Sequence, residues 1–135
     1  MSWRPGASEL VGALAAAGVP LALVTSSPRH WVERFATAVD LTPFRVIVTA
    51  DDTALTKPAP DPYLRAAAAL GLAPSRCVAI EDSLVGAAAA VAAGCATVVV
   101  GDGGRSLPRG ARGIASLVGV DADRLRSVAR DAMSS

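Results

Sequence analysis

The chain has 135 residues, of which 52% are hydrophobic and 19% charged, and its formal net charge is +1. This balance predicts one globular domain over residues 1–135 with an apolar core, and it excludes an intrinsically disordered chain. The near-zero charge argues against a general binder of nucleic acid or of anionic membranes, but it allows a local phosphate site. Two cysteines and a start without the pattern of a signal peptide indicate a cytoplasmic protein.

Four short runs rich in valine, leucine and isoleucine have the length and composition of strands buried on both faces. Helical patterns precede the first run and separate the others. The first helix carries Leu10 and Leu14 on one face and ends at Gly18, and the second begins with Ser27 as cap and Pro28 in its first turn. The predicted strands are Leu21 to Thr25, Val46 to Thr49, Cys77 to Ile80 and Ala96 to Val100.

The later helices also have recognisable ends. A third helix is predicted over Asp61 to Gly71 and a fourth over Ser83 to Gly94. Residues 101–104 read GDGG and predict a surface loop that continues to about Gly113, and Asp121 to Met133 predicts a final amphipathic helix. The alternation of helices and strands predicts an α/β fold, a Rossmann-like three-layer α/β/α arrangement with a mostly parallel sheet.

In an open parallel sheet the ligand site lies beyond the carboxyl ends of the strands. The first predicted strand runs into Thr25 and Ser26, whose hydroxyls, with amides of the next helix's first turn, can bind an oxyanion such as phosphate. A simpler interpretation is that this turn only closes the strand and caps the helix. Lys57 follows the second strand in the string TKPAPDPY, where prolines hold the loop and the ammonium can pair with phosphate. Asp51 and Asp52, earlier in this loop, are interpreted as solvent-facing turn residues.

Two adjacent carboxylates, Glu81 and Asp82, directly follow the third predicted strand. Like charges at a buried strand end repel each other, which is costly unless a cation neutralises them. Carboxylate oxygens suit Mg²⁺, which takes one or two of them and keeps water or a substrate phosphate as its other ligands. The alternative is an acidic pair that only favours the dipole of the following helix.

The succession of PG, VTSS, KPAPDPY and EDSLVGAAAAVAAG resembles the haloacid dehalogenase (HAD) superfamily, in the branch of phosphoglycolate phosphatases and β-phosphoglucomutases. The last string fits that branch's pattern EDSxxGxxAAxAAG at each fixed position. The resemblance implies a Mg²⁺-dependent phosphohydrolase for a small phosphorylated metabolite, in which Thr25 and Ser26 hold the phosphoryl group. It also implies that Lys57 neutralises the charge of that group and orients the nucleophile, and that Glu81 and Asp82 hold Mg²⁺.

The nucleophile motif of this family, of the type DxDGT, does not occur before Pro5, and the helical cap that selects the substrate does not occur either. The family's chemistry passes through an aspartyl-phosphate, so we expect a core truncated at its N-terminus, with the nucleophile supplied by a segment absent here. The family places that strand between those at Leu21 to Thr25 and Cys77 to Ile80. We therefore expect a gap in the sheet between these two strands. Either the two strands pair directly, or another chain fills the gap, or the protein is a marginally stable, aggregation-prone monomer.

Other interpretations compete with this one. A phosphorylation-receiver domain also combines acidic residues, a threonine and a Lys-Pro pair, but its acidic pair comes first in the chain. A nucleotide-binding module needs a glycine-rich turn after the first strand, whereas GDGG follows the last one. A truncated, catalytically inactive remnant that binds phosphate and metal fits the same residues and stays the alternative to an enzyme.

Overall fold

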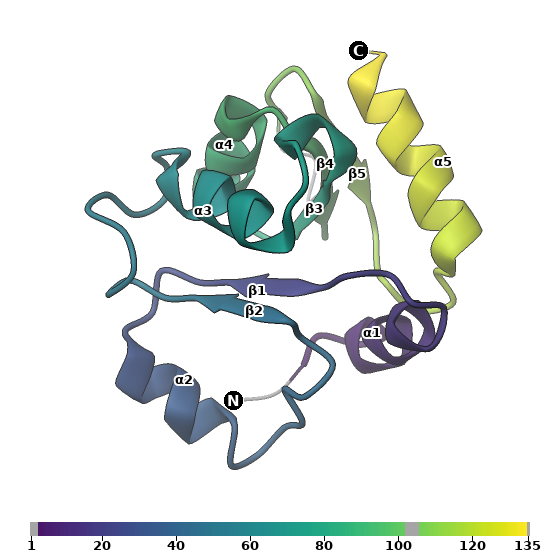
Figure 1. The fold of residues 1–135 in the computed structure, drawn as a ribbon. Coiled ribbons are helices and arrows are strands. Elements are labelled where there is room, and N and C mark those ends of the chain that lie inside the picture. Colours follow the sequence, from purple (N-terminus) through teal and green to yellow (C-terminus); the bar gives the residue numbers. More distant parts are fainter. Residues whose placement is uncertain (1–2, 102–105, 135) are drawn as a thin grey trace.

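Helices and strands alternate along the chain as far as Val100, as the sequence predicts, and a further strand then follows before the last helix (Figure 1). The structure, a computed structural model, describes residues 3–101 and 106–134, so most of the predicted GDGG loop lies outside the described residues. A short 3₁₀ helix, Pro74–Arg76, precedes the third strand. The helices are α1 (Ala7–Ala16), α2 (Arg29–Phe35), α3 (Asp61–Leu70), α4 (Leu84–Ala93) and α5 (Ala122–Met133); the strands are β1 (Ala22–Val24), β2 (Val46–Val48), β3 (Val78–Glu81), β4 (Ala96–Val100) and β5 (Ala111–Ile114).

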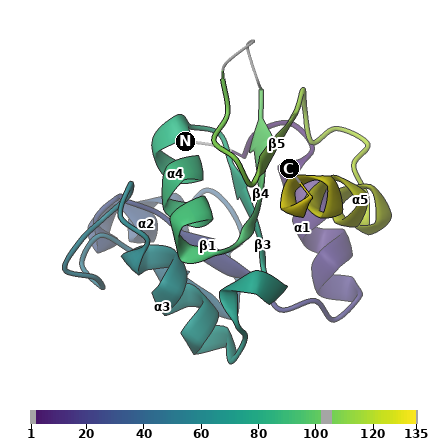
Figure 2. The same ribbon diagram turned by 90° about the horizontal axis from the view of Figure 1, so that it is seen from above.

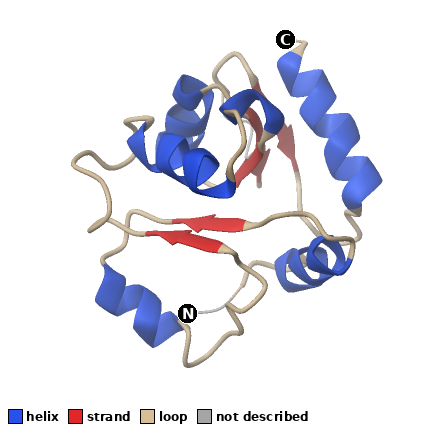
Figure 3. Cartoon of the chain, viewed as in Figure 1, coloured by secondary structure: helices blue, strands red, loops and turns tan. Residues whose placement is uncertain are grey.

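The strands form two separate parallel sheets (Figure 3). β1 pairs with β2 from Ala22 opposite Val46 to Val24 opposite Val48. β4 lies between β3 and β5 and pairs with both in parallel. The parallel pairing and the helical connections confirm the predicted α/β class.

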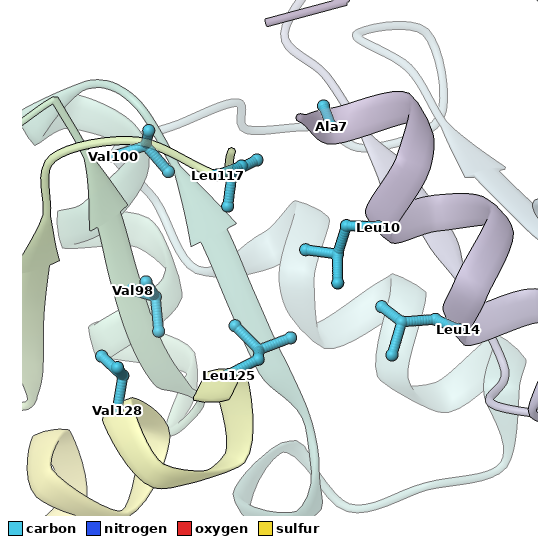
Figure 4. Packing of buried hydrophobic residues seen from close by; sticks show 8 residues of the cluster. All are labelled: Ala7, Leu10, Leu14, Val98, Val100, Leu117, Leu125 and Val128. Carbon is cyan, nitrogen blue, oxygen red and sulfur yellow. The ribbon is translucent and has the colours of Figure 1, made fainter. Parts of the chain in front are cut away.

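Helices cover both faces of the three-stranded sheet (Figure 2). α3 and α4 lie on one side of it and α1 and α5 on the other. All five residues of β4 are buried, because this strand meets apolar helices on both faces. On the α1 and α5 side, Leu10 and Leu125 point toward Val98 of β4 (Figure 4). Within residues 3–101 and 106–134, no helix combines the length and apolar character needed to cross a membrane.

The structure corrects two local expectations. The predicted loop before Gly113 contains the edge strand β5, whose Arg112 and Gly113 are exposed, so the segment lacks the apolar run of a buried strand. The predicted cap of α2 by Ser27 is wrong, because the N-cap position is Pro28 and no local side chain caps the helix. Instead the Asp51 carboxylate accepts a 2.7 Å hydrogen bond from the first helical amide.

A cavity of about 690 Å³ separates β1 from β3. On β1, the Leu21 carbonyl and the Thr25 amide bond to the β2 side, so the alternation of a strand directs the backbone of Ala22 and Val24 toward the cavity. On β3, the Cys77 carbonyl bonds to the β4 side, and the same alternation directs the Val78 and Ile80 backbone groups toward the cavity. β1 and β3 do not pair with each other, so direct pairing, one of the three outcomes expected for the gap, is absent from the structure.

Helix α4 begins three residues after the end of β3. The Ser83 hydroxyl caps the helix by accepting a 3.0 Å hydrogen bond from the Gly86 amide, as the sequence predicts. A Cβ added to Gly86 would lie 1.9 Å from Oε1 and 2.2 Å from Cδ of Glu81. Only glycine therefore permits the Glu81 carboxyl group to rest against the first turn of α4.

We predict that backbone amides facing the cavity exchange hydrogen fastest within the strands. The amides of Val24 and Ile80 should exchange at least about a hundredfold faster than that of Val98, which lies in the central strand of a sheet. The amide of Leu23, which faces β2, is the control within β1. Native-state hydrogen exchange measures this difference. Equal protection of Val24 and Val98 would show that the cavity edge has a strand partner in solution.

Gly86→Ala is expected to destabilise the protein by about 3 kcal/mol or more, because the new methyl group overlaps the Glu81 carboxyl group. Gly12→Ala is the matched control: it lies inside α1, nothing lies within 4 Å of its added Cβ, and it should stabilise by about 1 kcal/mol. Chemical denaturation measures both changes. A neutral Gly86→Ala substitution would contradict the close approach of Glu81 to α4.

Candidate functional site

Four of the five side chains predicted to form the site come together at the carboxyl ends of β1 and β3. Thr25, Lys57, Glu81 and Asp82 line the cavity between these strands. Ser26 does not line it and is exposed. The topology explains the convergence, since parallel strands end at the same edge and the loops that follow them share that edge.

Lys57 connects the two sheets. Its Nζ donates a 3.1 Å hydrogen bond to the carbonyl of Val24 at the end of β1 and a 2.5 Å bond to Oε2 of Glu81 at the end of β3. The side chains of Lys57 and Glu81 are 12% and 7% exposed, so this ion pair is buried, unlike most lysine pairs. The Lys57–Pro58 peptide bond is cis.

Tyr63 is the second donor to Glu81. Tyr63 lies in the first turn of α3, and its hydroxyl donates to Oε2 of Glu81, the same oxygen that accepts from Lys57. Lys57 Nζ also lies 5.3 Å from the centroid of the tyrosine ring. Burial, together with the neighbouring Glu81 carboxylate, raises the pKa of Tyr63, so the hydroxyl keeps its proton and remains a donor.

Asp82 is placed differently from its neighbour. Its side chain is 56% exposed and forms a 3.1 Å ion pair with Nε of Arg4, whose side chain is 50% exposed. Because side chains alternate along an extended chain, adjacent Glu81 and Asp82 lie in unlike surroundings, one buried and one at the cavity rim. The two carboxylates are thus each opposed by a cation of this chain.

The turn after β1 is occupied largely by bonds within the protein. The Thr25 hydroxyl accepts a 3.0 Å hydrogen bond from the Ser27 amide. The Arg29 amide is taken by Asp51. The expectation that amides of this turn are open to an oxyanion is therefore wrong for these two amides, while the hydroxyls of Thr25 and Ser26 stay candidates.

Asp52 is not the solvent-facing turn residue that the sequence suggests. Its side chain is 14% exposed and pairs with Arg29. Its Oδ2 accepts from the amide of Thr49 at 2.7 Å and from the hydroxyl of the same residue at 2.9 Å. The bond from the Thr49 amide lowers the pKa of Asp52, so this carboxylate stays ionised and anchors the loop that leads toward Lys57.

The donor set at the rim suits a hard divalent cation only in part. Among the described residues, no group of three or more His, Cys, Asp or Glu side chains is gathered as a ligand set. Glu81 and Asp82 nevertheless supply two neighbouring carboxylates, and Mg²⁺ is commonly bound by one or two carboxylates with water and phosphate oxygens as its other ligands. These two residues are the candidate ligands: Asp82 lies exposed at the rim, whereas Oε2 of Glu81 already accepts from Lys57 and Tyr63.

Two residues of the site escape the sequence analysis. Tyr63 ends the string KPAPDPY, but its pairing with Glu81 spans 18 positions and carries no local signal. Arg4 lies 78 positions from Asp82 and precedes Pro5 without any distinctive spacing. The usable signal for Tyr63 is a lone polar aromatic residue followed by an alanine-rich helix face, where its buried hydroxyl needs a partner.

Comparison with known proteins agrees with the geometry. Residues 3–94 match the family of haloacid dehalogenase-like hydrolases. The chain is 43% identical over 99 residues to protein CbbY of Rhodobacter capsulatus, and this match covers 70% of the chain and 44% of the relative. It is 40% identical over 95 residues to phosphoglycolate phosphatase of Escherichia coli, covering 70% of the chain and 38% of that enzyme.

A solved structure gives the same picture. The crystal structure of a CbbY variant from Rhodobacter sphaeroides in complex with xylulose 1,5-bisphosphate superposes with a TM-score of 0.76 at 31% identity, covering 90% of this chain and 58% of that one. The matches thus span less than half the length of the two curated relatives. With a family match over residues 3–94 and this shared fold, the chain belongs to the haloacid dehalogenase-like hydrolases.

Proposed function

We propose that the chain is the phosphate- and metal-binding core domain of a Mg²⁺-dependent phosphohydrolase that acts on a small phosphorylated metabolite. The observation that carries this proposal is the convergence of Thr25, Lys57, Glu81 and Asp82 at one cavity between two parallel sheets. The relatives support the substrate class, because one is named for phosphoglycolate and another holds a sugar bisphosphate.

Each side chain has a proposed role in phosphoryl transfer. The Thr25 hydroxyl, which lines the cavity, donates a hydrogen bond to an oxygen of the phosphoryl group. Ser26, which is exposed outside the cavity lining, is proposed as a second donor that turns toward the bound phosphoryl group. The Lys57 ammonium neutralises part of the negative charge on the same group, which grows in the transition state. Its bonds to Val24 and Glu81 hold it at the cavity, so little reorganisation is needed when a substrate binds.

The proposed reaction needs a carboxylate nucleophile from outside these 135 residues. One oxygen of that carboxylate forms a bond to phosphorus while the bond from phosphorus to the ester oxygen breaks, and the departing alkoxide oxygen takes up a proton to leave as the alcohol. Water then cleaves the aspartyl-phosphate, which releases inorganic phosphate and restores the carboxylate. Glu81 and Asp82 would hold Mg²⁺, which would supply electrostatic stabilisation of the phosphoryl oxygens when bound.

The second candidate function is a phosphate- and metal-binding remnant without turnover. Both candidates use the same residues, so binding alone does not separate them. The codons upstream of Met1 do: an in-frame motif of the type DxDGT favours the enzyme, and a stop codon favours the remnant.

We predict that the isolated polypeptide binds inorganic phosphate in the presence of Mg²⁺ and that Lys57→Ala weakens this binding by about tenfold or more, because a charge-assisted hydrogen bond is lost. Arg112→Ala is the matched control, since it also removes one positive charge but lies exposed on β5. Phosphorus NMR titration measures both affinities. Equal affinities in the wild type and Lys57→Ala would contradict the phosphate site.

The isolated polypeptide should hydrolyse no generic phosphate ester, because no nucleophilic carboxylate is positioned on the phosphoryl group. Colorimetric release of phosphate tests this. Mg²⁺-dependent turnover that Asp82→Asn abolishes would place the nucleophile within these 135 residues.

In a protein that includes the nucleophile strand, Lys57→Ala and Asp82→Asn should each lower kcat by about a hundredfold or more, since each removes electrostatic stabilisation of the transferring group. Asp131→Asn, an exposed change on α5, is the control and should retain the full rate. Steady-state kinetics with saturating substrate measure the effect. Rates near the wild type for both site variants would refute the assignment of the site.

A further inference from the structure

The geometry points to Tyr63 as a positioning residue that holds Lys57 in place through Glu81. The inference rests on the proposed function, in which the Lys57 ammonium faces the phosphoryl group. Tyr63 touches neither the proposed phosphate nor the proposed metal. It acts through a single atom, Oε2 of Glu81, which accepts from both the tyrosine hydroxyl and the ammonium.

The Glu81 carboxyl group has little freedom apart from these two bonds. Oε1 and Cδ of Glu81 lie against Gly86 of α4, which leaves no room there even for a methyl group. The other carboxylate oxygen is fixed by Tyr63 from α3 and by Lys57 from the loop before α3. Removal of the tyrosine hydroxyl leaves a buried carboxylate one donor short, and the carboxylate then loses its fixed orientation.

The loss passes directly to Lys57. Among the described contacts, the ammonium donates to two oxygens, the Val24 carbonyl and Glu81 Oε2. Once the carboxylate turns, only the carbonyl bond holds the ammonium, and a lysine side chain has four rotatable bonds with which to leave the cavity. The tyrosine hydroxyl therefore sets how long Lys57 stays at its position.

We call the chain of contacts from Tyr63 through Glu81 to Lys57 the relay, and the composition of the protein makes it directly measurable. Lys57 is its only lysine and Tyr63 its only tyrosine. Reductive methylation therefore reports on Lys57 and on the terminal α-amino group alone, and the terminal group serves as internal reference. Every tyrosine signal in a Raman spectrum belongs to Tyr63.

The experiment compares the methylation rate of Lys57, relative to the terminal amine, in four proteins: wild type, Tyr63→Phe, Glu81→Gln and the double variant. Tyr63→Phe keeps the ring and should raise the relative rate about tenfold, the size expected when a hydrogen bond to a charged group is lost. Glu81→Gln should raise it at least as much. In the Glu81→Gln background, Tyr63→Phe should add less than about twofold, because both changes break one relay.

Thr97→Val is the control for general destabilisation. The Thr97 hydroxyl is fully buried and donates a 3.1 Å hydrogen bond to the Cys95 carbonyl, so its removal breaks a buried hydrogen bond that does not involve Glu81. This variant also loses a buried hydroxyl but should leave the relative rate of Lys57 within about twofold of the wild type. A Thr97→Val rate equal to that of Tyr63→Phe would reduce the role of Tyr63 to ordinary stability and overturn the inference.

Other outcomes also decide the matter. An unchanged rate in Tyr63→Phe, or an equal effect of Tyr63→Phe with and without Glu81, shows that Tyr63 does not act through Glu81. The Raman spectrum needs no substitution of Tyr63: the wild type should show a strongly donating hydroxyl that weakens in Glu81→Gln and not in Thr97→Val. Suppose that the methylation rates show the relay while Lys57→Ala leaves the phosphate affinity unchanged. That combination would refute the proposed function and keep the positioning role of Tyr63.

Discussion

The buried ion pair between Lys57 and Glu81 is the contact that ties the two sheets together at the edge where the site lies. Removing both charges from water costs several kcal/mol, and such a pair persists only where geometry and further hydrogen bonds compensate. The structure supplies those bonds through the Val24 carbonyl and the Tyr63 hydroxyl. The same bonds therefore set both the distance between the carboxyl ends of β1 and β3 and the position of the Lys57 ammonium. A change that loosens the pair alters the cavity and the site together.

Helices α3 and α4 make this constraint possible because their contact faces are small. α3 packs on β1, β2 and α4, and α4 packs on β3 and β4, so the helix pair spans the cavity on one side. Ala89 and Ala90 are fully buried where α4 meets Tyr63 of α3. Larger side chains there would push the tyrosine away from Glu81, just as a methyl group on Gly86 would displace the carboxylate itself. The small alanine side chains of these helices therefore allow the Tyr63 hydroxyl to come within hydrogen-bond distance of Glu81.

The sequence predicts what depends on neighbouring residues and misses what depends on distant ones. The buried strands follow from apolar runs such as the one ending at Val100, and the ends of α3 and α4 follow from Gly71 and Gly94, which take the left-handed conformation. The edge strand β5 has no such run. Two other contacts join residues about twenty positions apart: the cap of α2 by the Asp51 carboxylate and the bond from Tyr63 to Glu81. No spacing rule predicts contacts at such a separation. The convergence of the site residues was predictable because topology alone brings strand ends to one edge.

The charges of the site bear on how the proposed ligands enter. Lys57 with Glu81, and Arg4 with Asp82, form two ion pairs whose charges cancel. Counted over these four residues alone, without the nucleophilic carboxylate, a phosphate dianion or a divalent cation by itself would leave about two uncompensated charges, whereas the two together cancel. The two pairs differ in strength: the exposed Arg4 pair is weak and separates readily, while the buried Lys57 pair is held by further donors. In the proposed reaction, the buried pair therefore fixes where the phosphoryl charge is met, and Asp82 of the exposed pair would be the carboxylate more easily turned toward a cation.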